Sequence, residues 1–428
     1  MESMRRTPIS IAIALTAILV VLRPMVWAQP EPGPANGPPS AATVPAASDE
    51  MPRNPLTLYF LGQPLPELAP APTALPDPDL ADAPRTLDGP PCNPAVPSPV
   101  PVSPLKPQLG TVPGYLGSAG GGGGLGMAFS PVVGHIPYSG GYSDAEFFNS
   151  GVKGQNAHLG YFQQNLNFLM PIWQSSTDEF YADGRVGVET FSTNAILPST
   201  QQPFPSDLWN IGLGTGYRHL FDNGWTSGGS ISVGSASDQP FHSIREMTIS
   251  ASVFTRVPSG DRNAWVFGAA MSSNSQVLPY IPIPFAAYLY NPSKDFQAML
   301  GFPFANVIYR PVENLTLSMS YALLTNFHVR ATYQIARSWS VFAGLEFDNE
   351  NYWLADRQAT DQLFFYYNDR LSAGSQIVFS RNVLLQFSGG YIFDRYYFEG
   401  TSFTSGQNFN RVSIEPGAFL AAHLQVRF

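Results

Sequence analysis

The sequence predicts an all-β fold, a transmembrane antiparallel up-and-down β-barrel of about 12–14 strands behind a disordered Pro-rich N-terminal segment. Three observations predict it. Apolar and polar residues alternate with period two in many segments after residue 124. Short and long connections mostly alternate between those segments. The chain also ends in such a segment, whose last residue is the aromatic Phe428.

The N-terminus has the features of a secretory signal. Arg5 and Arg6 precede the apolar run Ile9–Leu22, and Val26–Ala28 places small residues where a signal peptidase cuts. We therefore expect residues 1–28 to be a cleaved signal peptide. The apolar run is too short, and ends too abruptly at Arg23, to anchor the chain in a membrane as a helix.

Residues 29–123 form a Pro/Ala/Gly-rich segment. Residues 29–113 hold 24 of the 41 prolines, and such a tract favours extended polyproline conformations that bury little apolar surface. We expect a disordered periplasmic tether. The alternative is a docking segment for periplasmic or cell-wall components, for which Asn54–Gly62 is the one short apolar island. The glycine run Gly120–Gly124 marks the boundary with the folded part.

The composition suits strands that have one lipid-facing and one hydrated face. Charged residues make up 12% and aromatic residues 13% of the chain, and the mean hydropathy is −0.04, which excludes a helical membrane protein. The net charge of −9 argues against nucleic acid as a partner. Cys92, the single cysteine, lies far from the signal and fits neither a lipidation site nor an intramolecular disulfide.

Period-two alternation predicts the individual strands. The clearest is 209–217, where bulky residues alternate with small and polar ones before the hairpin turn Asp222–Gly224. The same pattern predicts strands at 315–323, 327–333, 339–347, 383–391 and 417–428, and weaker ones at 162–172, 182–191, 225–235, 247–257, 265–273, near 296–308 and at 362–379. An even number requires one more strand before Phe162, for which Leu125, Met127, Phe129 and Val133 are candidates.

The connections predict an orientation. We expect short links at 221–224, 258–263, 336–338 and 380–382, and long ones at 192–207, 274–295, 348–361 and 394–416. Short turns at one rim and long loops at the other are typical of outer-membrane barrels. Counting back from a last strand that ends in the periplasm places the long loops outside the cell.

The segment Leu278–Pro303 mixes prolines with bulky apolar residues. Proline excludes much of it from a central strand, yet it is too apolar for a loop in water. Two interpretations stay open. It is an inserted loop that folds into the lumen and narrows it, or an outer loop that packs over the rim.

The last strand has two distinct faces. Phe428, Val426 and Leu424 continue an apolar face, and they are candidates for the signal that the barrel-assembly machinery reads. The opposite face carries the polar residues His423, Gln425 and Arg427. The final strand of a soluble β-sandwich would also alternate, so this strand alone leaves both folds open.

The stretch Leu208–Ser243 resembles part of a family of bacterial outer-membrane β-barrel proteins of unknown function. Leu278–Leu324 and Gly389–Gly400 carry the same resemblance, which covers roughly residues 142–428 and leaves the Pro-rich segment unmatched. It implies an exported β-barrel in the bacterial outer membrane, in contact with outer-membrane lipid. It brings no catalytic or binding residues with it.

We expect neither an enzyme nor a cofactor. His242 and Ser243 are adjacent, so on a strand their side chains would point to opposite faces and form no nucleophile–base pair. Asp348, Glu350, Asp356 and Asp361 share one long connection without a histidine. Asp348–Glu350 offers oxygen ligands for a divalent cation, although a solvated acidic loop is the commoner use of such a run. We expect no metal site.

A transport function would depend on the inward-facing side chains, because rings of polar residues set the selectivity of a pore. The candidate lumen-lining residues are Arg218, Glu246, Arg330, Glu346, Gln386, His423, Gln425 and Arg427. The sequence favours a passive channel or small-solute transporter. A non-conducting structural or adhesion barrel stays open, as does a secreted soluble β-sandwich that binds carbohydrate.

Overall fold

The computed structural model describes Met127 and residues 133–134, 136–276, 278–322, 326–357, 359–380, 382–403 and 410–428. The expected signal peptide (1–28) and the expected Pro-rich segment (29–123), with Asn54–Gly62 and Cys92, lie outside the described residues. Within the part of the chain that is described, no helix is long and apolar enough to cross a membrane.

The described residues form seventeen β-strands and one 3-10 turn, η1 (Ile244–Glu246). The strands are β1 (Ser139–Val152), β2 (Ala157–Gln174), β3 (Asp178–Thr193), β4 (Asp207–Leu220), β5 (Thr226–Ser237), β6 (Met247–Ser259), β7 (Asn263–Ser272), β8 (Ile283–Tyr290), β9 (Phe296–Phe302), β10 (Phe304–Val312), β11 (Leu315–Ala322), β12 (Asn326–Ala336), β13 (Trp339–Tyr352), β14 (Leu363–Ser380), β15 (Val383–Gly400), β16 (Val412–Ile414) and β17 (Gly417–Arg427).

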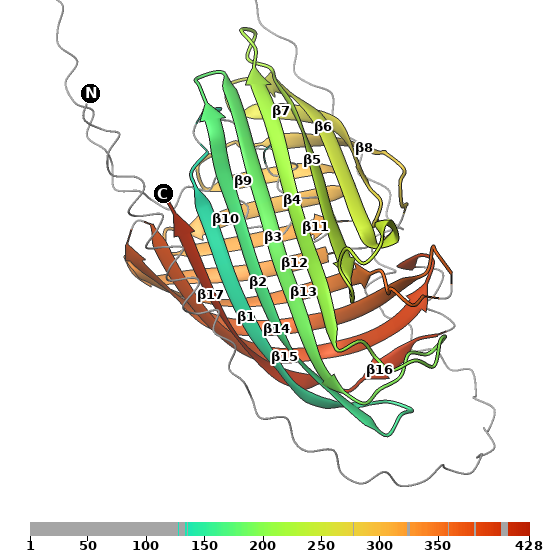
Figure 1. Cartoon of the computed structure of the whole chain (residues 1–428). Coiled ribbons are helices and arrows are strands. Elements are labelled where there is room, and N and C mark those ends of the chain that lie inside the picture. The colour runs from blue at the N-terminus through green and yellow to red at the C-terminus, as the bar shows by residue number, and fades with distance from the viewer. Residues whose placement is uncertain are drawn as a thin grey trace, which may run out of the picture. The chain divides into compact units, whose positions relative to one another are not determined.

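The strands close into a barrel. Successive strands pair antiparallel, and β17 returns to lie beside β1, where Arg427 is opposite Ser139 (Figure 1). β16 and β17 share a single place between β15 and β1. Glu415 and Pro416 separate them, since proline has no N–H to give to the ladder. The described strands therefore fill sixteen positions, which confirms the closed all-β barrel and the even number but exceeds the predicted 12–14.

The predicted number of strands is too low because two segments were misread. β8 lies wholly within Leu278–Pro303, where Pro284 at its start masked the strand pattern. β9 and β10 were expected as one strand near 296–308, yet they form a hairpin joined by Pro303 alone, without a usual turn sequence. Both interpretations of Leu278–Pro303 are therefore wrong, because most of this segment is barrel wall.

The first strand also differs from the expectation. Met127 and Val133, two of its proposed residues, lie outside any strand, and β1 begins at Ser139. β1 escaped detection because Asp144 and Glu146 interrupt the apolar face that its pairing with β17 requires. The alternation rule works only where the outward face is uniformly apolar.

The two rims of the barrel differ in their connections. At the terminal rim, where β1 begins and β17 ends, the links are 175–177, 221–225, 260–262, 291–295, 313–314, 337–338 and 381–382. At the opposite loop rim, several links are longer, namely 194–206, 238–246, 273–282, 353–362 and 401–411. The predicted short links all lie at the terminal rim. The predicted loops 348–361 and 394–416 are shorter than expected because β13 extends to Tyr352 and β15 to Gly400.

A belt of exposed apolar side chains surrounds the barrel. Its members include Phe168, Leu213, Ile231, Val253, Phe267, Leu300, Leu317, Val329, Leu371, Phe387 and Leu420. Exposed aromatic residues gather towards the terminal rim, among them Trp173, Tyr217, Trp225, Trp265, Tyr290, Tyr309, Tyr333, Trp339, Phe379 and Phe428. An apolar belt edged by aromatic rings is the surface that a barrel presents to lipid.

Inside the barrel, aromatic rings lie over glycines of neighbouring strands. Phe285 is directly opposite Gly268, and a Cβ added to that glycine would lie 2.4 Å from the Phe285 ring. Phe342 stands in the same relation to Gly374, at 2.6 Å. Because each glycine has no side chain, the aromatic ring can lie directly over its backbone. These pairs therefore hold neighbouring strands in register.

Candidate functional site: the lumen and its outer closure

Arg330 is the centre of a polar group on the inner face of β12, β14, β15 and β17. Its Nη2 donates to Gln386 Oε1 at 2.9 Å and to Gln376 Oε1 at 3.3 Å. Its guanidinium carbon lies 3.6 Å from the centre of the Phe342 ring. His423 is directly opposite Gln386 in the sheet. This part of the lumen thus presents amide groups around a positive charge.

Other candidate lumen residues lie on the same inner face. Gln425 and Arg427 follow His423 at the two-residue spacing of β17, and Glu346 is opposite Arg370 of β14. Arg218 forms a buried ion pair with Glu179, and its Nη1 donates to the carbonyl oxygen of Met127 at 3.0 Å. Arg218 is thus held by Glu179 and by the Met127 carbonyl oxygen inside the barrel.

The expectation for Glu246 needs correction. Glu246 was expected to line the lumen, but it ends η1 in the 238–246 loop at the loop rim. Its carboxylate accepts from the backbone N–H and the hydroxyl of Ser243, which forms a capping box at the start of η1. Ser243 therefore acts as a helix cap rather than as a strand residue beside His242.

The loop-rim end of β13 crosses to the opposite wall. The N–H of Trp353 donates to the carbonyl oxygen of Ala236 in β5 at 2.8 Å, and Trp353 forms an isolated parallel bridge with Ser237 at the end of the same strand. Since β5 lies on the far side of the barrel from β13, this end lies across the mouth. We call residues 349–357 and 359–367 the cap.

Two pairs of amide side chains join the cap to the 273–282 loop. Asn349 Nδ2 donates to Gln276 Oε1 at 2.9 Å, and Gln276 Nε2 donates back to the Asn349 carbonyl oxygen. Asn351 Nδ2 donates to Asn274 Oδ1 at 2.7 Å, and Asn274 Nδ2 donates to the Asn351 carbonyl oxygen at 3.2 Å. The four amide side chains form hydrogen bonds across this contact instead of with water, so the contact is polar although it is buried.

Aromatic residues fill the space on both sides of the cap. On one side, Tyr366 packs edge-on against Tyr161 of β2, with ring centres 5.7 Å apart. The cluster around it contains Phe147, Phe191, Phe204, Phe364, Tyr397 and Phe419. On the other side, Trp353, Leu363, Phe365, Tyr396 and Phe398 form a second buried cluster. Packed rings therefore cover both sides of the cap.

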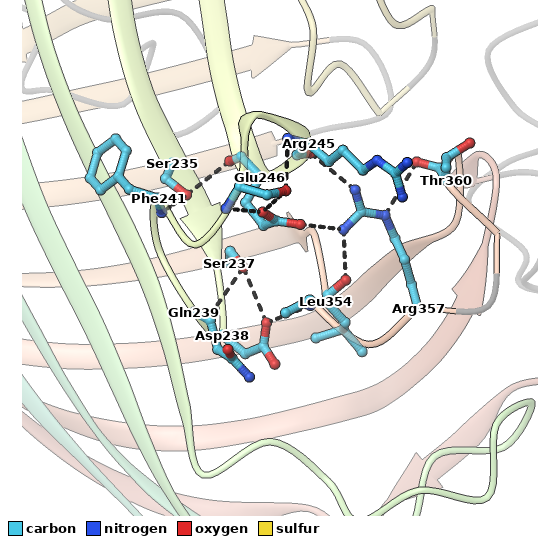
Figure 2. A network of polar contacts seen from close by, with 12 residues as sticks. Ser235, Ser237, Asp238, Gln239, Phe241, Arg245, Glu246, Leu354, Arg357 and Thr360 are labelled. Carbon is cyan, nitrogen blue, oxygen red and sulfur yellow. Dashed lines mark hydrogen bonds and ion pairs between the residues drawn. The ribbon is translucent and has the colours of Figure 1, made fainter.

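Arg357 binds the cap to the 238–246 loop (Figure 2). Its Nη1 lies 3.0 Å from Glu246 Oε1 and also donates to the carbonyl oxygen of Leu354 at 2.7 Å. Its Nη2 donates to the carbonyl oxygen of Arg245 at 3.0 Å, and its Nε to that of Thr360 at 3.2 Å. Arg357 thereby holds both loops at once, and we call this contact the latch.

Asp238 adds a second attachment in the same region (Figure 2). Its Oδ1 accepts from the backbone N–H of Ala355 at 2.9 Å and from the hydroxyl of Ser237 at 3.1 Å. The Ser237 hydroxyl also accepts from the N–H of Gln239. Asp238, at the start of the 238–246 loop, thus binds the backbone of the cap. Arg357 of the cap binds Glu246 at the end of the same loop.

The Glu246 carboxyl is suited to remain charged in this position. Burial raises its pKa, but hydrogen bonds from Ser243 and Arg357 outweigh burial and hold the pKa below the usual glutamate range. The carboxylate is therefore the stable form at neutral pH, and it pairs with a guanidinium that is always charged.

The acidic run at 348–350 does not converge on one point. Asp348 contacts His328 at 3.4 Å and Arg370 at 3.8 Å, while Glu350 accepts from the Tyr352 hydroxyl at 2.5 Å. Asn349 faces Gln276. Over the described ranges, no group of three or more His, Cys, Asp or Glu side chains is placed to hold a metal ion.

Sequence reasoning missed the cap and the latch. One signal was available, since Phe364–Tyr367 places bulky rings on both faces of a strand, which neither a lipid face nor a hydrated face explains. No local pattern marks Arg357 as the partner of Glu246, because the two residues meet only through the fold.

The candidate assembly residues lie on the outer face. Leu424 and Val426 are opposite Tyr142 and Gly140 of β1, and Phe428 is exposed at the terminal rim. The N–H of Phe428 donates to the carbonyl oxygen of Tyr138 at 2.8 Å. The last residue thus takes part in closing the barrel beside the first strand.

No known sequence family and no curated protein matches the chain, so the family resemblance stays a prediction. Solved structures show a weak likeness. An outer-membrane channel of Pseudomonas putida F1 is 10% identical over 69% of this chain and 96% of its own, with a TM-score of 0.32. Pseudomonas aeruginosa OccK7 is 10% identical over 68% of this chain and 99% of its own, with a TM-score of 0.33. The β domain of the Bordetella autotransporter BrkA is 11% identical over 69% of this chain and 100% of its own, with a TM-score of 0.26.

Proposed function

We propose that the protein is an outer-membrane β-barrel that passes small solutes and whose outer mouth is closed at rest by the cap. The apolar belt and its aromatic edge support a place in a membrane. The predicted signal peptide and the C-terminal strand support the bacterial outer membrane, reached through the barrel-assembly machinery. The terminal rim then faces the periplasm, where the N-terminal segment would act as a tether.

The observation that carries the channel proposal is the polar nature of the closure. The cap is joined to the opposite wall by two amide pairs, by Asp238 and by the Arg357–Glu246 ion pair. Water satisfies such groups almost as well as their present partners do, so separating them costs little net free energy. A permanently sealed barrel gains more from apolar packing, because buried ion pairs add little stability.

One observation favours a non-conducting structural barrel instead. The rings around Tyr366 and those around Trp353 bury apolar surface on both sides of the cap. Opening would expose this surface to water, which opposes opening. The two functions therefore differ in whether the cap moves under working conditions.

Single-channel conductance in planar bilayers tests the proposal. In a Cys92→Ser background, Asn274→Cys with Asn351→Cys places two thiols where the amide pair now joins the cap to the 273–282 loop. We expect channel openings in the reduced protein, few openings after oxidation and recovery with a reductant. Asn274→Cys alone is the matched control and should not respond to oxidation. A folded protein that stays silent in all redox states would reject the channel and favour the structural barrel.

A further inference from the structure

Two carboxyl groups project from the outer face of β1 into the apolar belt. Asp144 is opposite Ala422 of β17 and Gln164 of β2, while Glu146 is opposite Leu420 and Phe162. Leu420 and Phe162 are exposed belt residues. The outer face of β17 runs from Ala418 to Phe428, and Ala422 lies within it. Both carboxyl groups thus lie between the edges of the belt.

Charged side chains are rare on the outer face of the barrel. Among the described residues of β3 to β13, the side chains that share the outer face between the aromatic edges carry no charge. A carboxyl group that faces hydrocarbon loses its hydration and gains nothing in return. Within the membrane location proposed above, the outer face of β1 therefore needs a partner other than lipid.

The surroundings of the carboxyl groups supply hydrogen-bond donors. Gln164 Nε2 donates to the Tyr142 hydroxyl oxygen at 2.9 Å, so the Tyr142 hydroxyl can still donate its own proton to a group outside the barrel. Ala418 and Ala422 on the adjoining strand are small, so another surface can approach the backbone closely.

We propose that this face of β17, β1 and β2 is the interface through which two copies of the chain pair in the membrane about a two-fold axis. We call it the seam face, defined by Tyr142, Asp144, Glu146, Gln164, Ala418 and Ala422. The copies lie side by side with parallel barrel axes, and each seam face covers the other.

The chemistry of the seam face selects a second copy as the occupant. A two-fold axis brings a patch opposite itself, so the patch must hold both donors and acceptors. The Tyr142 hydroxyl and the Gln164 amide are donors, and the carboxyl groups of Asp144 and Glu146 are acceptors. In the pair, donors of one copy meet acceptors of the other, away from water and lipid. A partner that bears a basic side chain would satisfy the carboxyl groups but would leave the Tyr142 proton without an acceptor.

Cysteine cross-linking in native outer membranes and in proteoliposomes tests the interface. In a Cys92→Ser background, Ala422→Cys places a thiol on the seam face, and Ala331→Cys places one on the outer face of β12 as a matched control. We expect oxidation to give a disulfide-linked dimer with Ala422→Cys and little with Ala331→Cys. Equal yields at the two positions, or a link from Ala422→Cys to a different protein in native membranes, would overturn the proposal.

Tyr142→Phe keeps the ring and removes only the hydroxyl, so the barrel should fold as before. We expect the dimer dissociation constant in lipid to rise about 30-fold, because the two-fold pair loses two hydrogen bonds, one from each copy. An unchanged dissociation constant, or a wild-type protein that is monomeric at all protein-to-lipid ratios, counts against the interface. A dimer without conductance rejects the channel alone, whereas a conducting protein that stays monomeric at all protein-to-lipid ratios rejects the interface alone.

Discussion

Glu246 and Arg357 are 111 residues apart in the chain and form a buried ion pair of 3.0 Å across the mouth of the barrel. Glu246 belongs to the loop between β5 and β6, and Arg357 to the loop between β13 and β14. Because Arg357 also donates to three carbonyl oxygens of the two loops, this single side chain couples the cap to the opposite wall.

Arg357→Gln should increase the time that the channel spends open. Glutamine cannot reach the same set of acceptors, and a buried carboxylate without its partner costs about 1–3 kcal/mol in the closed state. Single-channel recording measures the open fraction. Arg337→Gln, in a turn of the terminal rim, is the control and should behave as wild type. An open fraction that is unchanged by Arg357→Gln would show that the latch does not hold the cap.

Acidification should release the latch. Because the folded-state pKa of Glu246 lies below its usual value, the ion pair contributes its full stability above the ordinary glutamate range. That stability is lost as the pH falls through the lowered pKa. We expect the open fraction of the wild type to rise at acidic pH. Glu246→Gln lacks the titrating group, so this part of the pH response should disappear, and an identical response in both proteins would contradict the assignment.

The sequence was informative where one face of a strand is lipid-facing and the other polar. Strand 209–217 and the last strand follow this rule, and both were predicted. The rule fails for β1, where Asp144 and Glu146 break the apolar face, and for Phe364–Tyr366, which is buried on both faces. Those exceptions coincide with the seam face and the cap. The contact between Arg357 and Glu246 depends on loops that meet across the lumen, which no local pattern encodes.

Gly268→Ala should destabilise the barrel. A Cβ at this position would lie 2.3 Å from the carbonyl oxygen of Val253 and 2.4 Å from the Phe285 ring. Overpacking of this kind costs about 1–3 kcal/mol. Heat-modifiability on gels and thermal unfolding in detergent measure the effect. Gly212→Ala is the control, because its nearest contact is the flexible Arg185 side chain at 3.3 Å. Equal thermal unfolding midpoints for the two variants would show that the Phe285 ring does not need the space that Gly268 leaves.

Removal of Phe428 should impair insertion before it alters any transport. Its side chain is exposed at the terminal rim, and its N–H closes the barrel against Tyr138, so deletion removes both the aromatic end and a closing hydrogen bond. Phe428→Ala keeps the backbone contact and separates the two effects. We expect fewer heat-resistant barrels in the outer membrane from both variants, with the larger loss on deletion. Phe379→Ala, which removes an exposed aromatic ring at the same rim, should insert normally. Normal yields of heat-resistant barrels from the chain without Phe428 would show that the terminal residue carries no assembly signal.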